Sequence, residues 1–203
     1  MKARLWFGVS TIILLVAMPV AARAQAGQRA GAPAAPAMTL TVSGFADGGQ
    51  IPVKLSQAAP GAAPGEGTSP AITWANVPAG TQSFVLNMRD LDVARNKTTD
   101  DQAHWVMWNI PAATTSLPEG VPKGSQRPDG SMQISATGPM YRGPGAPANG
   151  PQHHYMFEIY ALDTKLDVQP AADAFETRAN VMKAMQGHVL GKAVYGGLFK
   201  RPQ

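Results

Sequence analysis

The chain of 203 residues contains no cysteine. This absence excludes a disulfide framework, a thiolate nucleophile, cysteine-ligated zinc and iron–sulfur clusters. Charged residues are also few, at 15% against 44% hydrophobic residues, which favours one compact domain over a disordered chain. Any chemistry must therefore use oxygen and nitrogen side chains. The candidates are the acidic pair Asp90 and Asp92 and the four histidines, His104, His153, His154 and His188.

Glycine and proline are abundant instead, with 21 and 18 residues. Both residue types favour turns and interrupt helices. This composition is typical of many turns that join short strands, and it disfavours a helix bundle or a coiled coil. The fold class predicted from composition is therefore mainly β.

The first 24 residues have the pattern of a secretory signal peptide. Lys2 and Arg4 precede an apolar run over residues 5–20, and the small residues Ala22 and Ala24 mark a cleavage site. An uncleaved anchor is the alternative, but the sixteen residues of this run are short against the roughly 20 that span a bilayer. We therefore predict cleavage after Ala24 and a periplasmic or secreted product with no stable membrane insertion.

Processing also changes the charge balance. The full chain has 17 basic and 13 acidic residues, a net charge of +4. Loss of Lys2, Arg4 and Arg23 leaves an excess of one basic residue, which removes the main argument for nucleic-acid binding. Residues 25–37 are predicted to be a flexible lead-in, because ten of the thirteen are Ala, Gly or Pro, and the folded domain is predicted over 38–203.

Alternating apolar and β-branched residues predict the strands. Phe84, Leu86 and Met88 share one face of a strand that ends at Asp90. Further strands are predicted over residues 39–42, 51–55, 71–74, 104–110, 153–160 and 189–199, with a turn at 46–49 that joins the first two.

Two predictions concern which side chains share a face. In the strand at 104–110, both faces are largely apolar, which favours a central position in the sheet, and strict alternation places His104 on the side of Val106 and Trp108. One helix is predicted over 171–186, ended by Gly187. Its expected apolar face consists of Phe175, Ala179, Met182 and Met185.

The polar candidates cluster at strand ends. Asp90 and Asp92 are two residues apart, so in an extended chain their side chains point the same way; the alternative is that they accept backbone N–H groups of the following turn. His153 and Tyr155 share a strand face directly after residues 138–151, which include four glycines and four prolines, and His154 points the other way. Such a loop lets main-chain N–H groups approach a ligand.

Imidazoles, a tyrosine hydroxyl and loop amides can all donate hydrogen bonds, so together they predict a site for a small anion. An anion held by protonated imidazoles predicts that sulfate affinity falls as pH rises from about 5.5 to 8.

Other chemistries find less support. A metal site is not predicted, because His153 and His154 face opposite ways and the helical His-x-x-x-His spacing is missing. A hydrolase would need an activated nucleophile, and no serine stands in a Gly-x-Ser-x-Gly setting. No cofactor is expected. His188 follows the predicted helix and is interpreted as a cap or a buried hydrogen-bonding residue.

Several segments follow one another along the chain, among them Phe45-Ala46-Asp47-Gly48-Gly49, Ala71-Ile72-Thr73-Trp74, Asp90-Leu91-Asp92, His104-Trp105-Val106-Met107-Trp108-Asn109 and His153-His154-Tyr155. Read in this order, they resemble the phosphatidylethanolamine-binding protein family, in its bacterial Raf-kinase-inhibitor-like branch. The resemblance covers roughly Met38 to Arg201 in collinear order.

The resemblance implies a large central antiparallel sheet, a smaller sheet, few helices and a pocket for phosphate-like anions. By position it assigns the pocket to Asp90, Asp92, His104, His153 and Tyr155, together with Gly143 of the loop. The chain departs from the family pattern at Asp90-Leu91-Asp92-Val93-Ala94 and at Gly143-Pro144-Gly145-Ala146-Pro147, and it carries His154 where arginine is usual. These departures are expected to change the shape of the pocket.

The resemblance does not select one activity. The leading expectation is an exported, non-enzymatic protein that binds a phosphate or a phospholipid head group and acts on an unidentified protein partner. A periplasmic inhibitor of a protease or another enzyme, acting by surface contact, is the alternative, and a small hydrolase is the third. A homodimer is a further expectation from the family.

Overall fold

The computed structural model describes residues 36–203. The predicted signal peptide, and the lead-in up to residue 35, lie outside the described residues. Within the described part, no helix has the length and apolar character to cross a membrane. The prediction of a mainly β fold is confirmed, because two sheets and a single α-helix make up the regular structure of residues 36–203.

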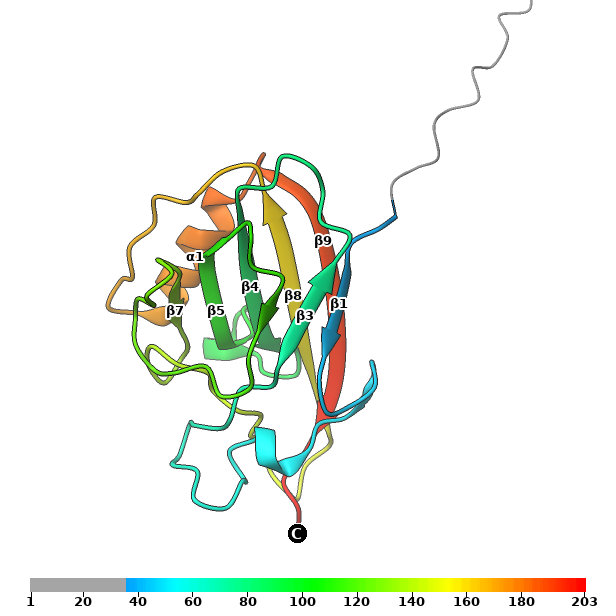
Figure 1. The fold of residues 1–203 in the computed structure, drawn as a ribbon. Coiled ribbons are helices and arrows are strands. Elements are labelled where there is room, and N and C mark those ends of the chain that lie inside the picture. Colours follow the sequence, from blue (N-terminus) through cyan, green and yellow to red (C-terminus); the bar gives the residue numbers. More distant parts are fainter. Residues whose placement is uncertain (1–35) are drawn as a thin grey trace, which may run out of the picture. The chain divides into compact units, whose positions relative to one another are not determined.

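The strands form a large sheet and a small sheet (Figure 1). The large sheet has six strands in the order β2-β9-β8-β4-β5-β7, and the small sheet has the order β1-β3-β6. The strand bounds are β1 Thr39–Val42, β2 Gly49–Gln50, β3 Ile72–Ala75, β4 Ser83–Asp90, β5 Gln102–Pro111, β6 Ser116–Leu117, β7 Met132–Ile134, β8 His153–Leu162 and β9 Val189–Phe199. Two short 3-10 turns lie at Val53–Leu55 and Arg95–Lys97.

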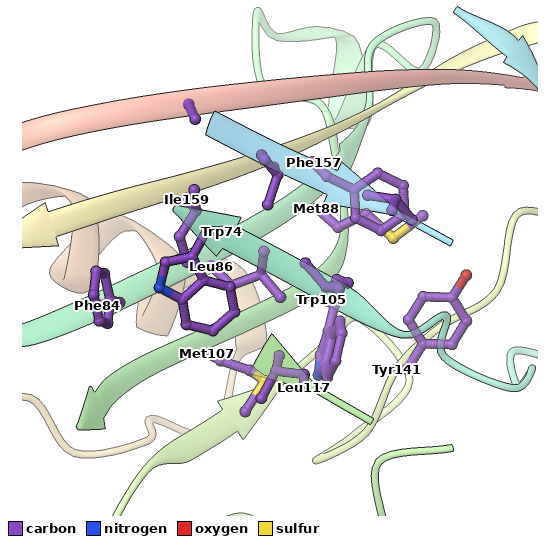
Figure 2. Packing of buried hydrophobic residues seen from close by; sticks show 14 of the residues in the cluster. Trp74, Phe84, Leu86, Met88, Trp105, Met107, Leu117, Tyr141, Phe157 and Ile159 are labelled. Atoms are coloured by element: carbon purple, nitrogen blue, oxygen red, sulfur yellow. The ribbon is translucent and has the colours of Figure 1, made fainter. Parts of the chain in front are cut away.

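The main core fills the space between the two sheets. Phe84, Leu86 and Met88 point into it, as their alternation predicts, and each is fully buried. Trp74 of β3 comes from the small sheet and packs edge-on against Phe84, with 5.3 Å between ring centroids (Figure 2). Burial of such large side chains is the main source of stability in a two-sheet core.

The helix α1, Ala174–Ala184, covers the opposite face of the large sheet (Figure 1). Asp173 caps it by accepting a hydrogen bond from the backbone N–H of Phe175, at 3.0 Å. The predicted apolar face is half correct: Met185, at the C-cap, is buried and Met182 packs against the same core. Ala179 is exposed, and the other buried helix residues are Ala174, Thr177 and Val181. Phe175 instead lies half-buried under the guanidinium of Arg95, which is 3.3 Å from its ring centroid. This cation–π contact explains why a large apolar residue is not in the core.

The predicted hairpin of residues 39–42 and 51–55 is also wrong. β1 pairs with β3, whereas Gly49 and Gln50 form the short β2, parallel to β9. Residues 53–55 form a 3-10 turn. Pro52 has no N–H to donate and fixes its own φ, so a strand does not continue past it.

β5 carries a β-bulge at His104 that positions the site. Met88 of β4 pairs with Trp105, but the next residue, Arg89, pairs with Ala103, so His104 is the extra residue. The extra residue re-aims its side chain. His104 therefore lies on the side of Trp105 rather than on the predicted side of Val106 and Trp108. The predicted central position of the strand is confirmed, because β5 has β4 on one side and β7 on the other.

Candidate functional site

Asp90, at the end of β4, is the centre of a buried polar cluster. Its carboxylate is 3% exposed and accepts three hydrogen bonds. His153 Nδ1 donates to Oδ2 at 2.8 Å, the backbone N–H of Asp92 donates to Oδ1 at 3.0 Å, and the hydroxyl of Tyr155 also donates. Asp90 and Tyr155 are directly opposite in the pairing of β4 with β8, which brings these side chains together.

The β5 bulge brings His104 to the same cluster, with its ring 5.1 Å from that of Tyr155. His104 Nδ1 donates to the carbonyl oxygen of Arg142 at 2.9 Å. Its Nε2 is 4.0 Å from Asp90 Oδ2, beyond hydrogen-bond distance. Burial lowers the pKa of His104 to about 4, although the carbonyls of Arg142 and Gly143 and the charge of Asp90 oppose that shift. The ring is therefore neutral at physiological pH.

Tyr155 links the strand cluster to the loop that precedes β8. Its hydroxyl oxygen accepts hydrogen bonds from the backbone N–H groups of Gly145 and Ala146, both at 3.2 Å. Burial, followed by the charge of Asp90, raises the pKa of the Tyr155 hydroxyl. The hydroxyl stays protonated, and its hydrogen bonds hold the loop close to the strand.

Gly143 lies behind the cavity rather than on its wall. A Cβ atom there would be 2.8 Å from the carbonyl oxygen of Glu66 and 2.9 Å from the backbone nitrogen of Gln57. The carbonyl oxygen of Gly143 accepts a hydrogen bond from Gln57 Nε2 at 2.7 Å. The structure thus gives this glycine a packing role, in which the loop lies against a neighbouring backbone that only glycine allows so close.

Asp92 fits neither interpretation, because its carboxylate accepts hydrogen bonds from His154 of β8 rather than from the following turn, and it does not line the cavity. Its backbone N–H bonds to Asp90, and its own carboxylate accepts hydrogen bonds from the backbone N–H and the ring Nδ1 of His154, at 2.5 and 3.1 Å. Burial would raise the pKa of Asp92, but these hydrogen bonds outweigh it and lower the pKa. Asp92 and His154 form an exposed pair beside the cavity. The expectation that His154 points away from His153 agrees with this placement.

A small cavity of about 210 Å³ opens beside the cluster. Its wall includes four of the predicted residues, Asp90, His104, His153 and Tyr155, but not Asp92 or Gly143. Sequence reasoning missed Gln57, Gln102 and Arg142, which also line it. Arg142 had one available signal, its position as the only cation in the Gly/Pro-rich segment 138–151.

Most of the hydrogen-bond donors predicted for an anion are already used within the protein. The N–H groups of Gly145 and Ala146 bond to Tyr155, and Tyr155 and His153 Nδ1 bond to Asp90. The guanidinium of Arg142 is different, because its Nε atom is buried with no hydrogen-bond partner among residues 36–203. Arg142 is thus the one arginine or lysine among the residues of 36–203 that line this cavity, and its Nε is left without a partner there.

Among residues 36–203, one group of side chains lies close enough to share a metal ion. Single donor atoms of Asp90, Asp92 and His153 lie within 4.8 Å of one another. His153 already bonds to Asp90, and Asp92 already bonds to His154. We assign no metal to a group whose members satisfy each other in this way.

His188 is not buried, but its backbone N–H donates to the carbonyl oxygen of Met185, the C-cap residue of α1, at 3.0 Å. It is exposed, and its Nδ1 lies 2.8 Å from Oδ1 of Asp163. The interpretation of a buried histidine is therefore wrong, although its hydrogen-bonding role is present.

A larger cavity, about 430 Å³, lies on the opposite face of the large sheet beside α1. Its charged side chains neutralise one another. Asp101 pairs with Arg89 at 2.7 Å and with Arg178 at 2.5 Å, and Glu158 pairs with Lys192 at 2.8 Å. This network braces the helix against the sheet, and we assign it no ligand.

Comparison with known proteins identifies the family. The model of the phosphatidylethanolamine-binding protein family matches residues 41–200. The chain belongs to this family. A UPF0098 protein of Methanothermobacter thermautotrophicus is 39% identical over 166 residues, which cover 81% of this chain and 99% of the relative. A Mycobacterium tuberculosis relative named as the lipoprotein LppC is 30% identical over 158 residues, covering 77% of this chain and 71% of its own.

Solved structures of phosphatidylethanolamine-binding protein homologues share the fold. Chlamydia trachomatis CT736 has a TM-score of 0.65 at 27% identity and covers 81% of this chain and 98% of its own. Escherichia coli YbcL, described as a new member of the mammalian family, has a TM-score of 0.63 at 26% identity and covers 81% and 99%. The predicted large and small sheets with few helices are those of this family.

Proposed function

We propose that this protein is an exported, non-enzymatic binding protein whose cavity holds a phosphate-like anion, either free or as a phospholipid head group. One observation carries the proposal: Arg142 lines a small cavity, and its buried Nε has no hydrogen-bond partner within residues 36–203. Guanidinium is planar, stays charged and matches the oxygens of phosphate with parallel N–H groups. The size of the cavity, about 210 Å³, suits a small oxyanion.

Binding without catalysis is supported by the types of residue that line the cavity and by their hydrogen bonds. No serine, threonine or lysine is among the side chains that line this cavity in the described chain. The hydroxyl of Tyr155 has a raised pKa and is held in three hydrogen bonds, so it is a poor nucleophile. Burial keeps His104 neutral, but its free Nε2 faces the acceptor Asp90 rather than any hydroxyl that it could activate.

Export is supported by the N-terminal pattern and by the name of one relative. Lys2, Arg4, the apolar run and the small residues before Gln25 are typical of a signal peptide. The mycobacterial relative named a lipoprotein belongs to a class of exported proteins. We therefore place the mature protein in the periplasm or outside the cell.

Ligand-dependent melting tests the binding function. Inorganic phosphate, phosphoethanolamine and acetate are added to the mature chain, and the melting temperature is followed. A ligand at a hundred times its Kd stabilises by about 2.7 kcal/mol, which corresponds to roughly 5 to 11 °C for a domain of this size. Arg142→Gln should lose the shift, whereas Arg127→Gln, in an ion pair with Asp129 away from the cavity, should keep it.

Absence of any shift with phosphate or phosphoethanolamine at millimolar concentration would contradict the proposal. An equal shift in wild type and Arg142→Gln would locate the anion elsewhere. A separate assay for release of product from phosphate and carboxylate esters tests catalysis. If the protein hydrolyses such esters and His104→Ala abolishes the activity, the proposal of a non-enzymatic protein is overturned.

A further inference from the structure

Two hydrogen-bond acceptors face each other in the cavity without a donor between them. A carbonyl oxygen can only accept, so His104 Nδ1, at 2.9 Å from the carbonyl of Arg142, carries the proton of the ring. In the neutral ring, Nε2 then presents a lone pair, 4.0 Å from Oδ2 of Asp90. A group that enters this gap must bring a hydrogen-bond donor, because another acceptor would face two lone pairs.

His104 and Tyr155 keep these protonation states across physiological pH. Asp90 comes from β4, His104 from β5, His153 and Tyr155 from β8, and Arg142 from the loop before β8. The low pKa of His104, about 4, leaves the imidazole neutral, and the raised pKa of Tyr155 leaves its hydroxyl protonated. Tyr155 and His153 Nδ1 already donate to Asp90, so neither of these protons is available to the gap.

We propose that the cavity selects an oxyanion that keeps a proton, of which the monoanion of a phosphomonoester is the simplest. Arg142 holds the charged oxygens, and the P–OH group donates into the gap between His104 and Asp90. This inference rests on the proposed anion-binding function and narrows its ligand. A phosphodiester, such as the phosphate of a phospholipid, has no such proton, and a sulfate ester has none at neutral pH.

Methyl phosphate and methyl sulfate are matched probes for this test. At pH 5 both are monoanions of nearly the same shape, but only methyl phosphate carries an O–H group. In titration calorimetry with the mature chain, we expect methyl phosphate to bind about tenfold more tightly or better at pH 5. The ratio of the two affinities cancels any proton taken up by the protein itself, because that uptake affects both ligands.

The pH dependence of this ratio provides the second arm. The second pKa of a phosphomonoester is about 6, so its monoanion falls from about nine-tenths of the total at pH 5 to about one-hundredth at pH 8. We expect the ratio to fall toward one over this range. Arg142→Gln should weaken both ligands and leave the ratio at pH 5 above one, since His104 and Asp90 recognise the proton.

Equal affinities at pH 5, or a ratio that does not change up to pH 8, would overturn the inference and leave the anion-binding function standing. Dimethyl phosphate separates free monoesters from diester head groups. It is a monoanion without an O–H, so it should bind as weakly as methyl sulfate, and tight binding would overturn the inference in favour of a head group. Failure of all three probes to bind would instead overturn the proposed function itself.

Discussion

Gly143→Ala tests whether the loop behind the cavity is held by close backbone packing. The new Cβ would lie 2.8 Å from the carbonyl oxygen of Glu66, 2.8 Å from the carbonyl carbon of Ser56 and 2.9 Å from the backbone nitrogen of Gln57. All three neighbours are backbone atoms, so no side chain can rotate away and the loop itself must shift. Overpacking of this kind costs about 1 to 3 kcal/mol.

Such a cost corresponds to a fall in melting temperature of roughly 2 to 12 °C for a domain of this size. Phosphate affinity should fall as well, because Arg142 precedes Gly143 directly and would move with it. Gly150→Ala is the matched control: it lies in the same loop, and its nearest neighbour would be a proline side-chain atom, Pro147 Cγ, at 3.3 Å. Thermal melts and phosphate titrations of both variants provide the measurement. If Gly143→Ala melts within about 1 °C of wild type and binds phosphate normally, the packing argument is refuted.

Three further predictions follow from the site and the N-terminus. His104→Gln should make the free energy of unfolding less sensitive to acid, because the folded pKa of His104, about 4, lies below the unfolded value near 6.5 and the unfolded chain therefore binds the extra proton. Between pH 7 and pH 4.5, the free energy of unfolding of the wild type should fall by about 2 to 3 kcal/mol more than that of the variant in denaturant titrations, with His188→Gln as the control. His153→Ala should weaken phosphate binding about five- to 150-fold, because it removes a wall residue and leaves the buried Asp90 carboxylate without one of its donors. His154→Ala should change phosphate binding less than about twofold, and equal losses in calorimetry would contradict the assigned faces. Intact-mass measurement of the exported protein should show a chain that begins at Gln25, and a full-length species in membranes would revive the anchor.

The regular parts of the large sheet could be predicted from the sequence because their side chains alternate without interruption. β9 has its predicted bounds, and Phe84, Leu86 and Met88 lie in the core as expected. The bulge at His104 could not be predicted, since an extra residue in one strand shows only against the partner strand. The helix face could be predicted only in part for a related reason: Met182 and Met185 face the core, but Phe175 contacts Arg95, a residue distant in the chain.

The residue types at the site could be predicted, but not how they pair. Asp90, His104, His153 and Tyr155 meet as the resemblance implies. Which atoms donate to which depends on distances that a sequence does not contain. In the structure, several predicted donors bond to other groups of the protein. The expected role of protonated imidazoles must exclude His104, whose burial keeps it neutral above a pH of about 4. Arg142, in contrast, has no pattern of its own beyond a charge in a Gly/Pro-rich loop.

The bulge in β5 also has a consequence for changes in chain length. Near His104, the residues of β5 on each side of it alternate in step with β4, but the extra residue shifts this alternation by one position, so the two parts have different phases. Deletion of a single residue there would restore a regular ladder and turn either Gln102 or Trp105 to the wrong side of the sheet. The same deletion among the exposed residues 96–100 of the preceding connection would leave both phases intact. We therefore expect insertions and deletions to be tolerated in that connection. Within a few residues of His104 they should disrupt the cavity, because the alternation at this strand end determines which side chains face it.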